Sequence, residues 1–379
     1  MAKFPANDII TLLDRRVPHN LGESTSRDLT LGELIDLPGG ADLPPALAGL
    51  SLGYGTSRGD AALRAFLAEE SGVEPDDVLI TPGGAAGLFL TTFTLCDPGD
   101  EVVTTAPNFP PTLDVITAVG CKLGRHRLDF DRGYRIEPDE LRASLSPATR
   151  LVVLVTPHNP SGVAIEPARL QTLADTILTS CPDAYLVIDE TYREATYGDR
   201  PEPATAASLS PRVLVISSLS KALGAPGLRI GWLVCRDRPL MTELLRAKMN
   251  MVISCSVVDE ALALEVLRRK QRILDERRAM LHEAVSRVAR WVEAHGAQVE
   301  WVRPDGGALC CVRLRPGAYD QAAVARFHAA LPEQGAMVGR GPWFDEEDRV
   351  FRLGFGHLPL AQLDGALDAL SRALAIAAG

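Results

Sequence analysis

The stretch SSLSKALGAPGLRIGW, at residues 217–232, places an amine and a guanidinium in a segment with little side-chain bulk. Lys221 has small neighbours, and Arg229 follows eight residues later. An unhindered lysine amine can attack an aldehyde to form a Schiff base, and the hydroxyl of Ser218 and the guanidinium of Arg229 are groups that bind phosphate. The alternative is a glycine-rich turn with the lysine in solvent, so the rest of the chain has to supply partners for the amine.

Two other stretches place polar groups where an apolar run ends. TPGGAAG, at residues 81–87, leads into a helical pattern, and bare backbone N–H groups at a helix start form a cradle for phosphate. It is neither a Walker loop nor a GxGxxG fingerprint, and an ordinary strand-to-helix turn is the alternative. In TPHNPSG, at residues 156–162, Asn159 either directs its amide into a cleft or initiates a turn with the proline that follows.

A further stretch, LVIDETY at residues 186–192, ends an apolar run on a carboxylate. Asp189 at that position is costly unless a cation pairs with it, and a protonated pyridine nitrogen would be such a cation. Tyr192 lies three residues further on. The alternative is an N-cap for a following helix.

These stretches belong to a pattern of short apolar runs that alternate with helical segments. The runs predict strands buried on both faces, as parallel strands are. They lie at 77–83, 101–107, 149–157, 184–190, 212–219 and 229–235. Helical periodicity falls between them, at 85–96 and 167–181. The pattern predicts an α/β domain with a mostly parallel sheet and helices on both faces, in which ligands collect at the carboxyl ends of the strands.

The C-terminal third of the chain predicts a smaller α+β domain. Residues 259–296 carry one long amphipathic helical pattern, whose charged face is interpreted as solvated. Residues 308–315 and 349–356 alternate like antiparallel strands, and a final helix follows. Residues 38–55, rich in proline and glycine, are expected to be a connector.

Composition limits the domains, the partners and the compartment. At 379 residues we expect a large domain at 51–245 and a small domain formed by 246–379 with 1–50, which includes an N-terminal arm. The formal net charge of −10 argues against nucleic-acid binding. Seven cysteines without a CxxC pair predict neither a disulfide framework nor a zinc site. No apolar run suits a signal peptide or a membrane span, which makes the cytoplasm the expected location.

In this order the stretches resemble the class I/II aminotransferases of fold type I, which depend on pyridoxal 5′-phosphate (PLP). The likeness extends from SLGYGTSRGDAALRAFL, at 51–67, to FRLGFG, at 351–356. SxSK with an arginine eight residues later, preceded by NPSG and DETY, carries most of it. The resemblance implies the PLP-dependent transferase fold, bound PLP and a homodimer with shared active sites.

The same resemblance implies roles for the residues that would do the chemistry. Lys221 matches the Schiff-base lysine, and Asp189 matches the partner of the pyridine nitrogen. Tyr192 and Asn159 match the pair on the phenolic oxygen, and Asn159 also faces the substrate. Arg352 matches the arginine that pairs with the substrate α-carboxylate.

The remaining matches concern the phosphate and the ring of the cofactor. The phosphate site matches Ser218, Arg229 and the backbone of Gly84, Ala85 and Ala86. Phe109 matches the aromatic ring that stacks on the cofactor, a position more often held by tyrosine in this family. Tyr54 matches a residue that reaches the phosphate of the neighbouring subunit, which is why the resemblance implies a homodimer.

One segment departs from the family pattern. NLGESTSRDLTLGEL, at 20–34, replaces the glycine-plus-acidic pattern that usually opens these enzymes, so Glu23 and Thr25 are candidates to face the substrate. This segment, with PHNPSG and GLRIGW, gives a weaker resemblance to capreomycidine synthase-like enzymes of natural-product pathways.

The sequence therefore predicts a PLP-dependent aminotransferase that acts on an α-amino acid. The alternative on the same fold is elimination, replacement or cyclisation, or oxidative decarboxylation or deamination. A non-catalytic binding protein is a third hypothesis, and it lacks support because the reactive residues are retained and no helix-turn-helix extension is present.

Overall fold

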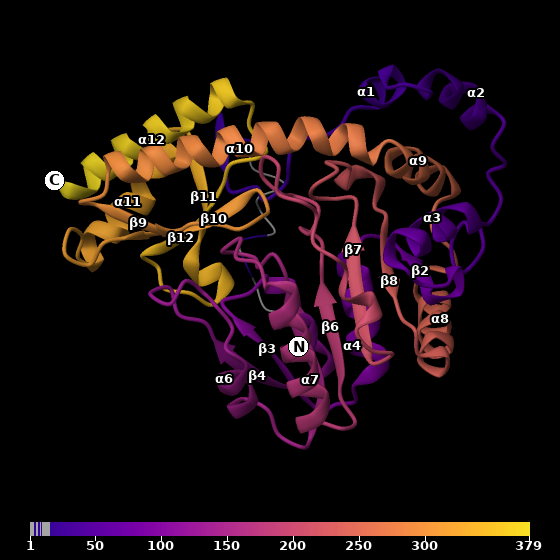
Figure 1. The fold of residues 1–379 in the computed structure, drawn as a ribbon. Coiled ribbons are helices and arrows are strands. Elements are labelled where there is room, and N and C mark those ends of the chain that lie inside the picture. The colour runs from indigo at the N-terminus through magenta and orange to yellow at the C-terminus, as the bar shows by residue number, and fades with distance from the viewer. Residues whose placement is uncertain (1–3, 5–6, 8, 10–15) are drawn as a thin grey trace.

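Two β-sheets organise the chain, and each has its own covering helices (Figure 1). The computed structural model describes residues 4, 7, 9 and 16–379. The larger sheet has seven strands in the order β2-β8-β7-β6-β5-β3-β4. Its strands are β2 (Val78–Thr81), β3 (Glu101–Ala106), β4 (Lys122–Arg127), β5 (Thr149–Val155), β6 (Tyr185–Asp189), β7 (Val213–Ser218) and β8 (Gly231–Val234).

The centre of this sheet is parallel, as the apolar runs predicted. Parallel pairing joins β4, β3, β5, β6 and β7. β8 is reversed, because it pairs antiparallel with both β7 and β2. The apolar sequence of β8 predicted a strand buried on both faces but could not show its direction, because helices cover the sheet whichever way the strand runs. β7 and β8 are joined by residues 219–230, a loop without a crossover helix, and this loop carries Lys221.

Alternate residues of the central strands enter two separate apolar cores. In β5, Leu151 and Val153 belong to one core, whereas Val152 and Leu154 belong to the other. Successive side chains of a strand point to opposite faces, so a strand covered on both sides needs an apolar residue at every position. The helices around this sheet are α4 (Gly84–Leu95), α5 (Pro110–Val119), α6 (Pro138–Ala143), α7 (Pro167–Ser180) and α8 (Arg238–Val252).

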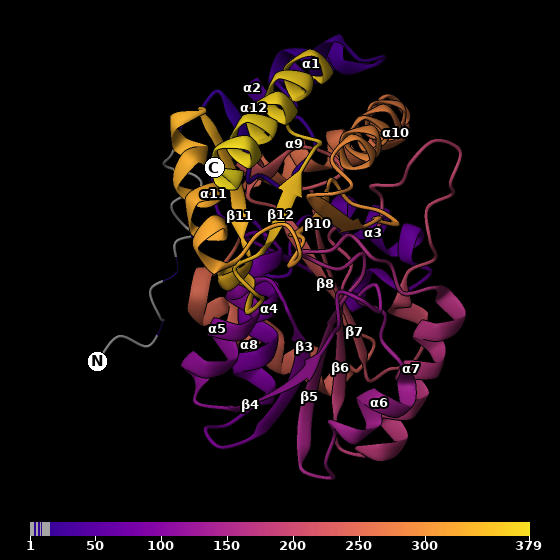
Figure 2. The ribbon, with the colours of Figure 1, turned by 90° about the vertical axis from the view of Figure 1, so that its left-hand side faces the viewer.

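The smaller sheet combines strands from both ends of the described chain. Its order is β1-β11-β12-β10-β9. These strands are β1 (His19–Leu21), β9 (Val299–Val302), β10 (Leu309–Leu314), β11 (Ala336–Arg340) and β12 (Val350–Gly354). β1 pairs parallel with β11, and the other pairs are antiparallel. Three helices lie alongside it (Figures 1 and 2), namely α10 (Lys270–Ala294), α11 (Gln321–Glu333) and α12 (Leu360–Ala378).

Two segments differ from the sequence expectation. The pattern at 259–296 is divided between α9 (Val257–Arg268) and α10 by Arg269, whose ψ of 9° lies outside the helical range. The amphipathic period continues across this break, so the period alone did not show it. The expected connector at 38–55 contains α2 (Leu43–Ala48), which begins with prolines in its first turn, where their missing N–H is tolerated.

Two short helices flank that connector. α1 (Leu31–Asp36) begins with a capping box formed by Thr30 and Glu33, and α3 (Ala61–Ser71) is capped by Asp60. The division at 51–245 stays a prediction; β2 to β8 fall within these residues, and the strands of the smaller sheet fall outside them.

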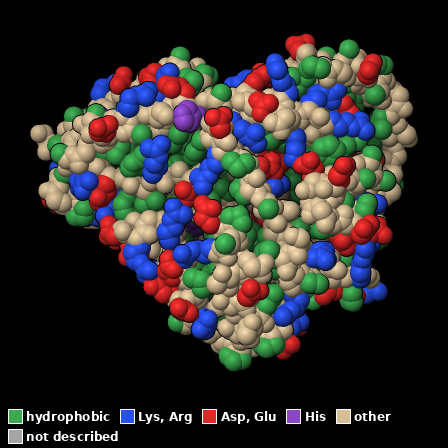
Figure 3. Space-filling view, in the orientation of Figure 1, with side chains coloured by type: hydrophobic (Ala, Val, Ile, Leu, Met, Phe, Trp, Pro, Cys, Tyr) green, Lys and Arg blue, Asp and Glu red, His purple; other side chains and the backbone are tan. Residues whose placement is uncertain are grey.

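On the face seen in Figure 3, positively charged Lys and Arg side chains are mixed with negatively charged Asp and Glu side chains, and neither sign predominates. Across residues 4, 7, 9 and 16–379, no helix combines the length and the apolar character needed to cross a membrane. The same residues contain no group of three or more His, Cys, Asp or Glu side chains suited to a metal ion.

Candidate active site

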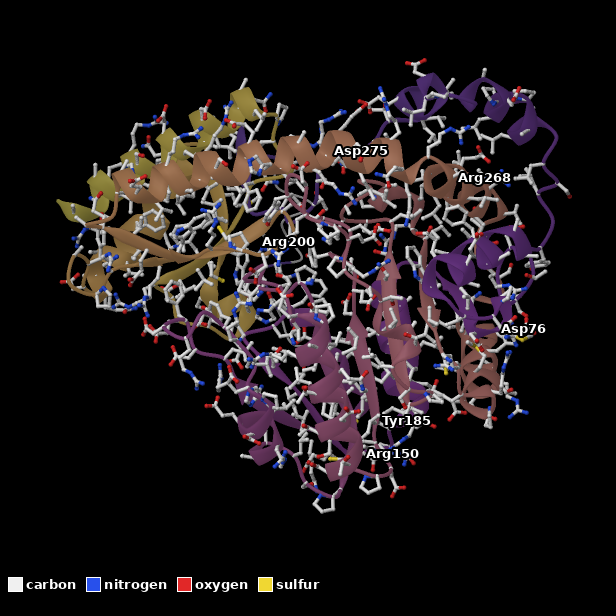
Figure 4. All side chains as sticks on the ribbon, in the orientation of Figure 1. Asp76, Arg150, Tyr185, Arg200, Arg268 and Asp275 are labelled. Carbon is white, nitrogen blue, oxygen red and sulfur yellow. The ribbon has the colours of Figure 1, made fainter. Side chains whose placement is uncertain are left out.

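The carboxyl ends of β6 and β7 point toward the part of the molecule that contains the smaller sheet (Figure 1), and β5 runs parallel to β6. Asn159, Asp189 and Ser218 lie at these ends or in the loops just beyond them. Arg150 and Tyr185 mark the opposite ends of β5 and β6, at the foot of the sheet in Figure 4. The polar residues singled out in the sequence therefore gather at the edge where parallel strands place ligands.

The turn after β2 is built for close approach. Gly83 has a φ of 85°, in the left-handed region that glycine tolerates, and Thr81 Oγ1 donates to its carbonyl oxygen at 2.9 Å. A Cβ on Gly83 would lie 2.4 Å from Arg229 Nη2. A Cβ on Gly231 would lie 2.5 Å from backbone atoms of Gly83 and Gly84. Only glycine at these positions lets β8 and Arg229 come this close to the start of α4.

This packing places a guanidinium beside a helix N-terminus. Arg229 is itself in the left-handed region, with a φ of 51°, and Nη1 donates to Pro226 O at 2.9 Å. In the first turn of α4, Gly84 and Ala86 are half-buried and Ala85 is exposed, so these N–H groups are accessible. Free N–H groups at a helix start attract an anion such as phosphate.

Asp189 is half-buried at the end of β6 and is held by Thr191. Its Oδ1 accepts hydrogen bonds from the backbone N–H of Thr191, at 2.9 Å, and from the hydroxyl of the same residue. Turns rather than a helix follow, so the N-cap alternative is wrong. Burial raises the pKa of the Asp189 carboxyl, while the bonds from Thr191 and the charge of Lys221 oppose that rise. A cation beside Asp189 would offset the cost of its burial.

Lys221 meets the N-terminal segment of the chain. Its Nζ donates to Ser24 Oγ at 3.2 Å and lies 5.7 Å from the centroid of the Tyr192 ring. The Tyr192 hydroxyl donates to the same Ser24 Oγ at 3.0 Å and accepts from Asn159 Nδ2 at 3.2 Å. The structure thus brings Lys221 and Tyr192 to one serine hydroxyl, and Asn159 to the hydroxyl of Tyr192.

Arg352 completes this group from β12. Its side chain is 3% exposed, and its guanidinium lies 4.7 Å from the centroid of the Phe344 ring. Nη1 donates to Asn159 Oδ1 at 3.0 Å, and Nη2 donates to Gly22 O at 2.6 Å. Nε has no hydrogen-bond partner among the described residues. A buried guanidinium with a free N–H is suited to a carboxylate.

Arg349 does not share this position. Its Nη1 donates to the carbonyl oxygens of Leu314 and Tyr319, at 3.3 and 3.4 Å, and its Nε lies 3.6 Å from Glu347 Oε2. These partners belong to the smaller sheet and its loops, so Arg349 serves as a natural comparison for Arg352.

The N-terminal segment at 22–29 lies between the two sheets because glycines make room for it. A Cβ on Gly354 would lie 1.6 Å from Glu23 O, and a Cβ on Gly224 would lie 2.3 Å from Arg27 O. Backbone hydrogen bonds fix it to the lysine loop, from Ser26 N to Lys221 O at 3.2 Å and from Leu29 N to Gly224 O at 2.7 Å. The glycines of FRLGFG and of SKALG therefore position this segment.

Glu23 and Thr25 have different surroundings within the segment. Glu23 is half-buried, and its carboxylate has no hydrogen bond or ion pair within the described part of the chain. Burial lowers the pKa of the Arg352 guanidinium, and the charges of Tyr192 and Glu23 oppose that shift. Thr25 is buried, with Oγ1 3.4 Å from His357 Nδ1. Glu23 therefore acts on Arg352, whereas Thr25 faces His357.

Two predicted residues lie outside the hydrogen-bonded group. Phe109 is half-buried at the start of α5 and packs with Met337 and Phe344. Tyr54 is 87% exposed, beside Leu52, and borders a groove of about 1010 Å³ that continues along α9 as far as Arg268, labelled in Figure 4. None of the residues around Lys221 lines this groove.

Four contributors were missed by sequence reasoning: Gly22, Ser24, Thr191 and Phe344. Thr191 lies inside the DETY stretch, and a hydroxyl two residues after a carboxylate is a known turn signal. Gly22 and Ser24 flank Glu23, but an isolated extended segment does not reveal which alternate residues face the site. Nothing in the sequence around Phe344 links it to an arginine.

The residues present fit PLP. The accessible start of α4 and Arg229 suit a phosphate, and a side chain on Gly83 would fill the space that Arg229 occupies. Burial raises the pKa of the Asp189 carboxyl, and a pyridinium beside it would counteract that rise. Lys221 supplies the primary amine for an aldehyde, with small neighbours around it.

Comparisons with known proteins agree with this fit. The family model for aminotransferase class I and II matches residues 46–370. Capreomycidine synthase from Streptomyces vinaceus is 32% identical over 362 residues, covering 94% of this chain and 89% of that protein. Arginine–pyruvate transaminase AruH from Pseudomonas aeruginosa is 28% identical, covering 83% of this chain and 78% of that protein.

Solved structures agree with the fold. A PLP-dependent aminotransferase from Streptococcus suis 89-1591 superposes with a TM-score of 0.89 at 25% identity, covering 99% of this chain and 98% of that one. The PLP-dependent cyclase OrfR superposes with a TM-score of 0.83 at 26% identity, covering 94% and 93%. The predicted fold type, the cofactor and the enzyme class are confirmed: the chain belongs to the aminotransferase class I and II family and uses pyridoxal 5′-phosphate.

Proposed function

We propose that this enzyme transfers the amino group of an α-amino acid and that Lys221 carries the cofactor between turnovers. One observation carries the proposal: four hydrogen bonds link Arg352, Asn159, Tyr192, Ser24 and Lys221 in series. A carboxylate-binding group and a reactive amine are thereby held at opposite ends of one connected set. An α-amino acid needs both, since its carboxylate must be held while its Cα reacts.

The residues divide the work as follows. PLP, when bound, withdraws electrons from the Cα of an amino acid joined to it. Asp189, held by Thr191, keeps a proton on the pyridine nitrogen. Lys221 Nζ removes the proton from Cα as a general base and returns a proton as a general acid. Arg352 orients the substrate by pairing its free N–H groups with the α-carboxylate.

We also propose that the substrate side chain is cationic. The Glu23 carboxylate lies on the segment between Gly22, which accepts a hydrogen bond from Arg352, and Ser24, which bonds Lys221. Since no ion pair between the described residues involves its carboxylate, a guanidinium or ammonium on the substrate would supply a partner. The similarity to an arginine–pyruvate transaminase supports this substrate class.

The second candidate is cyclisation, elimination or oxidation at the same site, in a natural-product pathway. It is supported by the similarity to capreomycidine synthase over nearly the whole chain and to the cyclase OrfR. The segment at 20–34, which departs from the aminotransferase pattern, contributes Ser24 and Glu23 to the site. Amino transfer, elimination and cyclisation share every step up to the loss of the Cα proton, whereas a decarboxylation breaks the bond from Cα to the carboxylate instead.

A panel of amino acids distinguishes the two candidates. The holoenzyme is mixed with each amino acid, without an amino acceptor, while its absorbance is followed and the products are identified by mass spectrometry. Amino transfer predicts one equivalent of keto acid and conversion of the cofactor to its amine form. Ammonia, water loss or a ring-closed product, formed over many turnovers, would contradict amino transfer and favour the second candidate.

We further propose that the enzyme is a homodimer in which Tyr54 of one subunit reaches the phosphate site of the other. We also propose that it is located in the cytoplasm. Tyr54 and Leu52 are 87% and 82% exposed and line a shallow pocket with Val257 and Val258, an apolar surface that a partner subunit would cover. All seven cysteines are free thiols, which suits a reducing compartment.

Subunit mixing tests the Tyr54 role. Lys221→Ala and Tyr54→Ala homodimers are each expected to have low activity. Mixed dimers contain one site with an intact Lys221 and a Tyr54 donated by the other subunit, so mixing should restore activity. No recovery after verified subunit exchange would place Tyr54 in its own subunit's site or outside it.

A further inference from the structure

Ser24 occupies an unusual place in the site, because its hydroxyl contacts the reactive amine directly. The side chain is 4% exposed. Ser24 Oγ receives the hydrogen bond of Lys221 Nζ at 3.2 Å and that of the Tyr192 hydroxyl at 3.0 Å. Among the described residues, Ser24 Oγ is the one side-chain acceptor that Lys221 has.

A hydroxyl suits both protonation forms of an amine. It carries one donor and two acceptor lone pairs, and its hydrogen rotates freely. Facing a protonated Lys221, Ser24 accepts from both Nζ and Tyr192. Facing a neutral Lys221, Ser24 still accepts from Tyr192 and turns its own hydrogen toward the lone pair of Nζ. The bond therefore survives when the amine gains or loses a proton.

The bonds that lead to Ser24 all have the same direction. Arg352 donates to Asn159 Oδ1 at 3.0 Å, Asn159 Nδ2 donates to Tyr192 Oη at 3.2 Å, and the Tyr192 hydroxyl donates to Ser24. In such a series each bond polarises the next. Ser24 is the link through which the carboxylate-binding arginine is connected to the lysine.

The position of Ser24 is also rigid. The segment carrying it passes within contact of Gly354, where any side chain would collide with Glu23 O. On its other side, Ser26 N donates to Lys221 O at 3.2 Å, so the backbone of the serine segment is bonded to the backbone of the lysine loop. The hydroxyl and the amine therefore keep their separation without relying on side-chain rotamers alone.

We propose that Ser24 is a catalytic residue that holds the released amine of Lys221 beside the substrate Cα. The Ser24 hydroxyl accepts a hydrogen bond from this amine when the amine is protonated and donates one to it when the amine is neutral, so the bond is kept while the amine takes up and returns the Cα proton. This role rests on the proposed function, in which Lys221 is the general base. No proton leaves Ser24 permanently: the proton removed from Cα goes to Nζ, and the hydroxyl only reorients.

The test compares Ser24→Ala with Ser26→Ala. Ser26 is two residues away, is 1% exposed, and its Oγ has no hydrogen-bond partner in the described chain. The two substitutions therefore remove the same atom from equally buried positions on one segment, and only the first removes a contact with Lys221. Tyr192→Phe is the second variant, because it removes the donor that precedes Ser24 and leaves the serine in place.

The first readout needs no activity. The cofactor-free protein is treated with limiting acetic anhydride, and labelling of Lys221 is measured by peptide mapping against the exposed Lys122. Loss of the Ser24 hydroxyl removes the acceptor of the Nζ hydrogen bond seen in the structure, and an amine released from that bond is more accessible to the anhydride. Ser24→Ala should raise the labelling rate of Lys221 at least threefold, Tyr192→Phe should raise it less, and Ser26→Ala should leave it unchanged.

The second readout is kinetic, with an amino acid that the panel shows to react. Ser24→Ala should lower kcat roughly 10- to 100-fold, the range for one hydrogen bond to a charged group, with KM within about twofold. The kinetic isotope effect of a Cα-deuterated substrate should increase, since proton transfer becomes slower than other steps. Ser24→Ala behaving like Ser26→Ala in both readouts would overturn the role of Ser24. If no amino acid reacts with the wild-type enzyme, the proposed function fails instead, and the labelling result still decides whether Ser24 contacts the amine.

Discussion

The two walls of the site are built in different ways. On the cofactor side, Gly83, Asp189 and Arg229 lie at the ends of strands of the larger sheet or in the loops beside them, and a hydrogen bond to a residue two or three positions away holds each of them. On the substrate side, Gly22 and Arg352 are 330 residues apart in sequence, and their hydrogen bond forms only because the N-terminal segment packs on the smaller sheet. The hydrogen bonds of the proposed cofactor wall are therefore local in sequence, whereas those of the proposed substrate wall depend on how the two sheets are assembled.

The largest effect is expected on the cofactor side, from Asp189→Ala. Removing one partner of a half-buried charge pair leaves the pyridinium without its counter-charge, at a cost of about 3–5 kcal/mol. Turnover should fall by roughly 100- to 5,000-fold, and cofactor should be retained weakly. Thr191→Ala, which keeps the carboxylate and loses only a hydrogen bond to it, should cost about 1 kcal/mol. Steady-state kinetics and equilibrium dialysis of cofactor measure both, and near wild-type kcat in Asp189→Ala would rule out its role.

The second largest effect is expected on substrate binding alone, and it distinguishes the substrate wall from the cofactor wall. Arg352→Ala should weaken substrate binding by about 2–4 kcal/mol while leaving the absorbance and affinity of the cofactor intact, because the residue bonds Asn159 and Gly22 rather than the phosphate cradle. Arg352→Lys should recover only part of the loss, since an ammonium cannot form a paired contact with a carboxylate.

Titration of the cofactor absorbance with substrate provides the measurement, and Arg349→Ala is the control. Arg349 bonds carbonyl oxygens of Leu314 and Tyr319, so its loss should leave substrate affinity unchanged. A larger loss in Arg349→Ala than in Arg352→Ala would mean that the carboxylate site has been assigned to the wrong arginine.

A smaller effect should follow from displacing the substrate wall as a whole. Gly354→Ala forces the segment at 22–29 to move, because its Cβ would lie 1.6 Å from Glu23 O. The overpacking should cost about 1–3 kcal/mol of folding stability and should weaken substrate more than cofactor. Gly317→Ala, where a Cβ meets nothing within 4 Å, is the matched control. Thermal denaturation and the two binding titrations check this; equal loss of cofactor and substrate affinity would show that the walls are not independent.

The smallest effect concerns the substrate side chain. Glu23→Gln should reduce the preference for a cationic over a neutral amino acid by a factor of about two to five, the worth of one partly exposed ion pair. Thr25→Ser should leave the ratio unchanged, because Thr25 faces His357. The measurement is the ratio of kcat/KM for the two substrates. An unchanged ratio in Glu23→Gln would show that Glu23 does not select a cationic substrate.

The sequence suggests site residues most readily where the signal comes from neighbouring residues. A carboxylate at the end of an apolar run draws attention to Asp189, and small neighbouring residues draw attention to Lys221. The glycines of the turn after β2 indicate a place where backbone segments approach closely. The direction of β8 and the break at Arg269 were missed because burial and helical period do not encode strand direction or a one-residue interruption. Ser24 was missed because its role comes from contacts with residues more than 160 positions away.

The central claim is that Lys221 carries the cofactor and faces the substrate wall. Borohydride reduction of the holoenzyme, followed by peptide mapping, tests it most directly. The prediction is a single pyridoxyl tag on Lys221, and loss of both the tag and the visible absorbance in Lys221→Ala. A tag on Lys248, which is fully buried and donates to Ser57 O at 2.5 Å, or an unchanged spectrum in Lys221→Ala, would contradict the account.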